Sequence, residues 1–115
     1  MDKYIPWTTV EQLVLVESID NYSHITTTDR WNLISECVVT TLKMISNIDQ
    51  RRFTPDNCSR EWTNIRRDLI SPYPDRGDEI QFAINCLRRK RIEELDKEMF
   101  NIKSKLLRLK DIPPY

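Results

Sequence analysis

The residues best suited to chemistry in this sequence are three cysteines and one histidine. Cys37, Cys58 and Cys86 are widely spaced and form no C-x-x-C pair, and His24 has neither a cysteine nor a second histidine close to it. Structural zinc sites and dithiol redox sites typically contain such ligands at short spacings. The single glycine of the chain also rules out a glycine-rich phosphate loop. We therefore expect reduced thiols that pack as small hydrophobes, and expect neither catalysis, nor a metal, nor a cofactor.

Charge is distributed unevenly along the chain, although the formal net charge is zero. Residues 1–50 carry an excess of acidic side chains and residues 80–115 an excess of basic ones. The tract Arg88-Arg89-Lys90-Arg91 suits a nuclear-localisation element or a contact with nucleic acid. Within a helix, however, it also suits a solvated face, on which an i,i+4 pair such as Arg89 with Glu93 neutralises part of the charge. We favour the solvated face.

The length of 115 residues fits one small domain with an extension. No apolar run approaches the roughly 20 residues that a membrane-spanning helix needs. The first residues also lack the pattern of a signal peptide. We therefore expect an intracellular protein that does not contact a membrane.

A helix from Thr54 to Leu69 has the clearest signals in the chain. Thr54 is a good N-cap, Pro55 suits the first helical position, and Asp56 places negative charge where the helix dipole favours it. Four residues then follow at spacings of four, three and four, and so share one apolar stripe: Cys58, Trp62, Ile65 and Leu69. This stripe predicts a core to which the preceding residues contribute.

Two more helices are expected upstream. Thr8 and Glu11 form a capping box, which predicts a helix from there to about Asp20. The continuous Leu13–Val16 run would also suit a strand, but the capping, length and polar flanks favour a helix.

A second helix is expected to begin near Arg30, with Thr28 or Asp29 as its cap, and it can extend to Ile45. The β-branched residues 38–41 weaken this extension, and residues 46–52 read as a polar connection. With one tryptophan in or beside each helix, the expected core comprises Trp7, Leu15, Ile19, Trp31, Ile34, Cys58 and Trp62.

Residues 71–79 contain two prolines and the only glycine, which predicts a linker between residues 1–70 and a long amphipathic helix over residues 80–112. In its second half, apolar residues at alternating spacings of three and four form a heptad seam that predicts partner binding: Ile92, Leu95, Met99, Ile102, Leu106 and Leu109. Ile80, Ile84 and Leu87 lie in a different phase. The first half is therefore expected to face the helical domain and the second half a foreign helix, from the same protein or from another.

Three short motifs in residues 5–70 resemble one Myb/SANT repeat. These are W-T-x-x-E at Trp7, followed by Leu15 and Ile19; Arg30-Trp31-x-x-Ile34; and Thr54-x-x-x-Cys58-x-x-x-Trp62. Together with the helix signals, this resemblance predicts an all-α protein with a three-helix SANT/Myb-like bundle in residues 1–70, followed by a long coiled-coil-type helix. The connection between the second and third helices is longer than in a standard repeat, and the third helix is not basic.

A Myb-type DNA-binding domain of a transcription regulator is the alternative that this resemblance allows. The third helix would then enter the major groove, with Arg60, Asn64 and Arg67 as candidate contacts. Residues 54–71 carry as many acidic as basic side chains, so they have no net positive charge to attract phosphates. We expect weak DNA binding or none.

The long helix makes the resemblance narrower. L-x-x-x-R-I-E-E-L at residues 87–95 and Leu107-Arg108-Leu109-Lys110 are similar to the N-terminal region of the bromodomain-containing subunit of the MYST-type nucleosomal histone acetyltransferase complex. Membership of that family would imply a nuclear, non-catalytic subunit. It would also imply assembly with an MRG-domain chromatin reader and that reader's small adaptor, here through the long helix. No bromodomain lies within these 115 residues.

Overall fold

The computed structural model describes residues 5–110, and every regular element in this range is helical, so the expectation of an all-α fold is confirmed. Two short elements, the 3₁₀ turn η1 and the π-helical turn η2, accompany four α-helices. In chain order the elements are α1 (Thr9–Asn21), α2 (Arg30–Ile45), η1 (Gln50–Phe53), α3 (Pro55–Ile65), η2 (Arg66–Ile70) and α4 (Glu79–Lys110).

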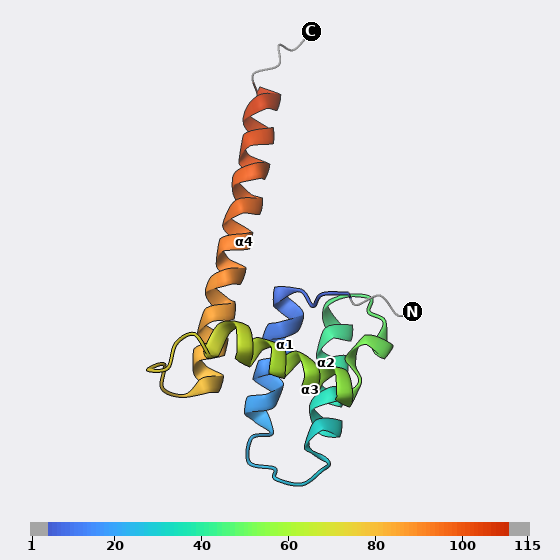
Figure 1. The fold of residues 1–115 in the computed structure, drawn as a ribbon. Coiled ribbons are helices and arrows are strands. Elements are labelled where there is room, and N and C mark those ends of the chain that lie inside the picture. The colour runs from blue at the N-terminus through green and yellow to red at the C-terminus, as the bar shows by residue number, and fades with distance from the viewer. Residues whose placement is uncertain (1–4, 111–115) are drawn as a thin grey trace.

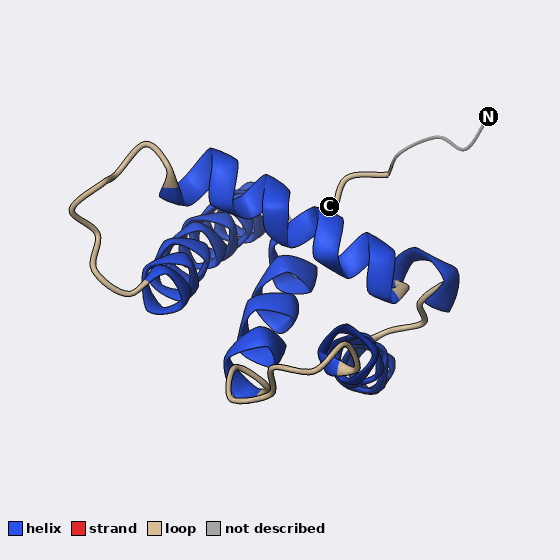
Figure 2. Ribbon diagram, turned by 60° about the horizontal axis from the view of Figure 1, so that its bottom comes forward, coloured by secondary structure: helices blue, strands red, loops and turns tan. Residues whose placement is uncertain are grey.

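The helices form a layer of three with a fourth across it. α2, α1 and the first part of α4 lie side by side, and α1 occupies the middle (Figure 1). α3 and η2 run as one rod across this layer, from α2 over α1 to α4 (Figure 2). The remainder of α4 projects away from the other helices, so the molecule is a compact body with one long arm.

The N-termini of α1 and α3 are fixed by the expected caps. In the capping box of α1, the Glu11 N–H donates to Thr8 Oγ1 at 3.2 Å and the Thr8 N–H donates to Glu11 Oε1 at 2.8 Å. Thr54 Oγ1 accepts from the Asn57 N–H at 3.2 Å. The cap expected for α2 differs, because Asp29 occupies the N-cap position in a helical backbone conformation and its side chain makes no capping hydrogen bond.

The connection between α2 and α3 contributes a large side chain to the core. Asp49 Oδ1 accepts from the Arg51 N–H at 3.1 Å, which helps to close the 3₁₀ turn η1. Phe53 ends this turn and is fully buried. The ring of Trp7 meets the Phe53 ring edge-on, with 4.9 Å between centroids and 81° between planes. The residue that directly follows the expected polar connection, residues 46–52, therefore supplies part of the core.

A π-helical turn changes the buried face of the α3–η2 rod. The Ser71 N–H donates to the Arg66 carbonyl at 2.8 Å, a bond over five residues that inserts one extra residue in the turn. Because the phase advances by one position, Ile70 is fully buried where Leu69 was expected, and Leu69 is only half-buried.

The core is made mostly of aliphatic side chains. Its buried residues are Leu15, Val16, Ile19, Ile34, Val38, Leu42, Phe53, Cys58, Ile65, Ile70, Ala83, Ile84 and Leu87. The three tryptophans expected at its centre, Trp7, Trp31 and Trp62, are instead half-buried and pack against its edge. A half-buried ring contributes less apolar burial than a fully enclosed one. The aliphatic residues and Phe53 therefore provide most of the packing.

The core also continues across the boundary expected at residue 70. Ala83, Ile84 and Leu87 of α4 are buried against the body, whereas residues 71–78 form an exposed turn before α4. Gly77 has a φ of +76°, a conformation that side chains rarely adopt. Asp78 Oδ1 then accepts from the Gln81 N–H at 3.0 Å and caps α4. The first turns of α4 are thus part of the folded body.

Candidate interaction surface

The second half of α4 carries a continuous apolar stripe that faces solvent. At the described positions of the predicted seam, the exposed fractions are 59% for Ile92, 42% for Leu95, 51% for Met99, 52% for Ile102 and 53% for Leu106. The side chain of Leu109 lies outside the described residues. Phe100 and Leu107 are also exposed, and their spacing of seven places both on one side of the helix, outside the stripe. Contiguous exposed apolar surface of this kind is typical of interaction sites.

Most of the stripe is exposed because it extends past the N-terminal end of α1. The two helices run antiparallel, as shown by an ion pair between Arg88 and Glu17 at 3.2 Å and by a hydrogen bond from Thr9 Oγ1 to Glu94 Oε2 at 2.7 Å. Thr9 is the first residue of α1, so the part of α4 beyond Glu94 has no helix beside it (Figure 1). At 1.5 Å per residue, this arm is about 24 Å long.

Glu94 connects the start of the arm to the body through its hydrogen bond with Thr9. The Thr9 hydroxyl and, more weakly, Arg91 lower the pKa of the Glu94 carboxyl below its usual value, because both interactions favour the charged form. Arg91 also lies 3.3 Å from Glu94 and 4.0 Å from Glu98. The ion pairs of the basic tract therefore differ from the expected pair of Arg89 with Glu93.

Charge along the arm changes sign. Residues 93–98 contain four acidic side chains, Glu93, Glu94, Asp96 and Glu98, against one lysine. Residues 99–110 contain no acidic side chain but hold Lys103, Lys105, Arg108 and Lys110. The apolar stripe therefore runs from an acidic segment into a basic one.

The candidate nucleic-acid contacts on α3 and η2 lie among acidic groups. Arg60 is exposed, but the Asn64 side-chain amide donates to Glu61 Oε1 at 3.4 Å. Arg67 forms an ion pair with Asp68 at 3.0 Å and thereby lowers the pKa of that carboxyl. These pairs reduce the attraction that the rod could exert on a phosphate backbone.

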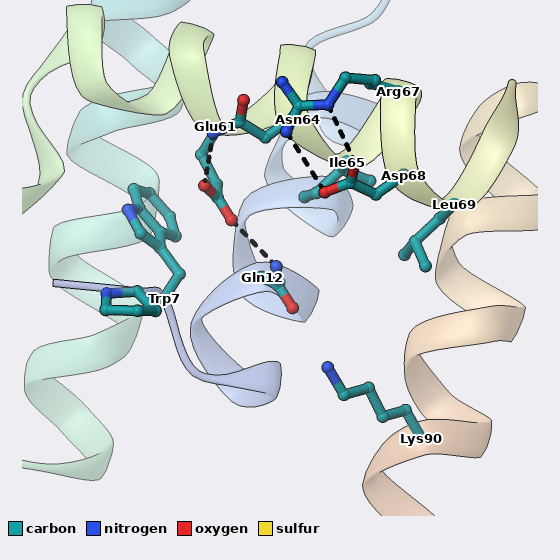
Figure 3. Close-up of a pocket in the computed structure, with 10 residues that line it drawn as sticks. Trp7, Gln12, Glu61, Asn64, Ile65, Arg67, Asp68, Leu69 and Lys90 are labelled. Carbon is teal, nitrogen blue, oxygen red and sulfur yellow. Dashed lines mark hydrogen bonds and ion pairs between the residues drawn. The ribbon is translucent and has the colours of Figure 1, made fainter. Parts of the chain in front are cut away.

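A cleft of about 310 Å³ lies between α1, the α3–η2 rod and α4 (Figure 3). Gln12 Nε2 donates to Glu61 Oε2 across it at 2.9 Å, and Lys90 lines it from α4. Its lining mixes both signs of charge with amides and a tryptophan edge: Pro6, Trp7, Gln12, Glu61, Asn64, Ile65, Arg67, Asp68, Leu69 and Lys90. Such a lining does not select one ligand chemistry.

The three cysteines are free thiols at buried or half-buried positions. Cys58 is fully buried, and burial raises the pKa of its thiol to about 12, which keeps it protonated and unreactive at neutral pH. Cys37 is half-buried and its sulfur accepts a hydrogen bond from Ser18 Oγ at 3.2 Å. Within residues 5–110, no group of three or more histidine, cysteine or acidic side chains is placed to hold a metal ion.

Comparison of the chain with protein-family models, with curated proteins and with solved structures found no match. In the described part of the chain, no helix is both long and apolar enough to span a membrane.

Proposed function

We propose that this protein is a non-catalytic interaction subunit, in which a small helical body presents the second half of α4 as an assembly arm. The observation that carries the proposal is the stripe from Ile92 to Leu106, whose described apolar members are each at least 42% exposed. An amphipathic helix gains stability when its apolar face is covered by another helix. The body offers no such cover beyond Glu94.

The sequence motifs indicate the kind of complex to which such a subunit would belong. The resemblance of residues 5–70 to a SANT/Myb repeat, and of residues 87–95 and 107–110 to the bromodomain-containing acetyltransferase subunit, supports a place in a nuclear histone acetyltransferase complex. In this proposal, the arm assembles with an MRG-domain protein and its adaptor. Arg89 and Lys90 are exposed on α4, as expected for a solvated face.

Sequence-specific DNA binding is the rival function. It is disfavoured by the acidic partners of Asn64 and Arg67. We expect the isolated chain to bind duplex DNA weakly and without sequence preference, measured by fluorescence anisotropy at physiological salt. Nanomolar, sequence-selective binding that is lost on Arg60→Ala or Asn64→Ala would favour the DNA-binding function instead.

The assembly function is tested by placing a charge in the stripe. Ile102→Asp should abolish co-purification of the other subunits from cells, because a carboxylate buried against apolar surface costs several kcal/mol. The melting temperature should not change, since Ile102 is half-exposed and lies beyond the body. Lys97→Asp is the matched control, because Lys97 lies on the face of α4 opposite the stripe. Equal loss of the subunits from both variants, or from neither, would contradict the proposal.

A further inference from the structure

The arm has a charge pattern that is complementary to itself when one copy is reversed. Its acidic segment, residues 93–98, and its basic segment, residues 99–110, lie on either side of the middle of the stripe. In two parallel copies, acidic would face acidic and basic would face basic, and the Arg88–Arg91 tracts would be brought together. In two antiparallel copies, each acidic segment lies beside a basic one, and the two tracts are at opposite ends. Electrostatics therefore favours the antiparallel arrangement.

The apolar stripe has the same symmetry. Its members are placed symmetrically about the midpoint between residues 100 and 101. Reversing one copy about that point brings Leu95 opposite Leu106 of the second copy and Met99 opposite Ile102, with each pair formed twice. The same operation sets Ile92 opposite Leu109. These are the a-to-d layers of an antiparallel coiled coil, and they require no shift of register.

The flanks of the stripe agree with this register. Asp96 and Lys103, seven residues apart, lie on one side of the stripe, and Glu98 and Lys105 lie on the other. In the antiparallel pair, Asp96 faces Lys103 of the second copy and Glu98 faces Lys105. These four pairs, which flank the central layers from Leu95 to Leu106, thus join opposite charges. Charge pairs at such flanking positions select orientation and partner in coiled coils.

From this double symmetry we infer that the arm pairs with the arm of a second copy of this chain, antiparallel and centred between residues 100 and 101. The inference rests on the proposed role of α4 as an assembly arm and identifies the first helix that covers the stripe. The bodies then lie at opposite ends of the paired arms. Phe100 and Leu107 stay outside the seam, where the pair can present them to other subunits.

The inference is tested on the purified 115-residue chain by measuring its mass with light scattering over a range of concentrations. The mass should rise from 13.8 kDa toward twice that value. Asp96→Lys with Glu98→Lys makes all four flanking positions basic, and Lys103→Glu with Lys105→Glu makes them all acidic. Each double variant should remain monomeric alone, and an equal mixture of the two should form a one-to-one dimer. The circular dichroism of each variant checks that the body stays folded.

Orientation is tested by disulfide formation. Leu95→Cys and Leu106→Cys, prepared separately and mixed under oxidising conditions, should link residue 95 of one copy to residue 106 of the other, as mapped by mass spectrometry. The parent chain serves as the control for its own cysteines. A link between two copies of Leu95→Cys would overturn the antiparallel pairing. A chain that is monomeric at every concentration would overturn self-pairing altogether, and the proposed function would still stand if that monomer captured other subunits through its stripe.

Discussion

At the scale of single residues, Phe53 is the side chain on which the core depends most. It is the largest of the fully buried side chains, and its contact with Trp7 joins η1 to the lead-in segment. Removing a buried aromatic ring leaves a cavity that the surrounding helices can fill only in part. Removing the ring of a half-buried tryptophan should leave a smaller void, since part of each ring already faces solvent.

Phe53→Ala should therefore lower the free energy of unfolding by about 3–5 kcal/mol, as measured by chemical denaturation. Met44→Ala is the control, since Met44 is 81% exposed and its replacement should change stability by less than about 0.5 kcal/mol. A Phe53→Ala protein as stable as the Met44→Ala protein would show that the η1 turn does not contribute to the core.

Glu94 gives a residue-scale prediction about pH. Its folded pKa is depressed, mainly by the Thr9 hydroxyl, so its stabilising contribution is fully present above the unfolded pKa, near 4.5, and is lost as the pH falls through the lower folded value. Thr9→Val removes the hydroxyl and should raise the pKa of Glu94 toward 4.5, as followed by NMR titration. The pKa of Glu79, which is lowered chiefly by Arg76, should not move and serves as the internal control. An unchanged Glu94 titration would contradict the contact between α1 and α4.

At the scale of elements, α4 is one helix with two environments. Its first half buries Ala83, Ile84 and Leu87, and its second half exposes the stripe that begins at Ile92. The apolar residues shift by one position between these halves. The first set faces α1 and η2, and the second set projects from a different side of the helix.

Two matched truncations should separate these environments. Leu87→Ala should cost about 2–5 kcal/mol of unfolding free energy, because it opens a cavity in the core. Leu106→Ala removes the same atoms from a side chain that is 53% exposed and should leave the stability of the monomer nearly unchanged. Both are measured by thermal unfolding of dilute protein. Equal destabilisation by the two variants would mean that α4 is not divided in this way.

The elements could be predicted from sequence to the extent that their signals are local. The capping box at Thr8 and the Thr54-Pro55 start act over a few residues, and the structure shows both. Phe53 was missed because it ends a short 3₁₀ turn with no periodic apolar neighbours. The burial of Ile70 in place of Leu69 depends on a π turn, which no residue pattern announces.

The arm illustrates the same limit. Its heptad spacing and its change of phase can be read from the sequence, and they predict that the second half of the helix does not pack on the body. The point at which α1 stops covering the arm depends on the antiparallel register of α1 and α4, in which residues 71 apart in sequence, such as Arg88 and Glu17, are in contact. Such long-range registers depend on packing and not on local propensity.

At the scale of the whole molecule, the arm dominates the shape. The radius of gyration is 18.2 Å and the longest extent is 68 Å, whereas a compact chain of this length would have a radius of gyration of about 13 Å. Ending the chain at residue 96 should reduce the radius of gyration to roughly 12–13 Å, as measured by small-angle X-ray scattering of dilute protein. The melting temperature should be retained, because the core ends at Leu87. A shortened chain that unfolds would show that the arm supports the body.

The most direct test of the division between body and arm is amide hydrogen exchange along α4 in dilute protein. Amides of residues 83–94 should exchange as slowly as those of α1, since both helices bury the same core. Amides beyond residue 97 should exchange far faster and should become protected when a second copy or another subunit covers the stripe. Equal protection along the whole of α4 in the monomer, or rapid exchange over residues 83–94, would contradict the account.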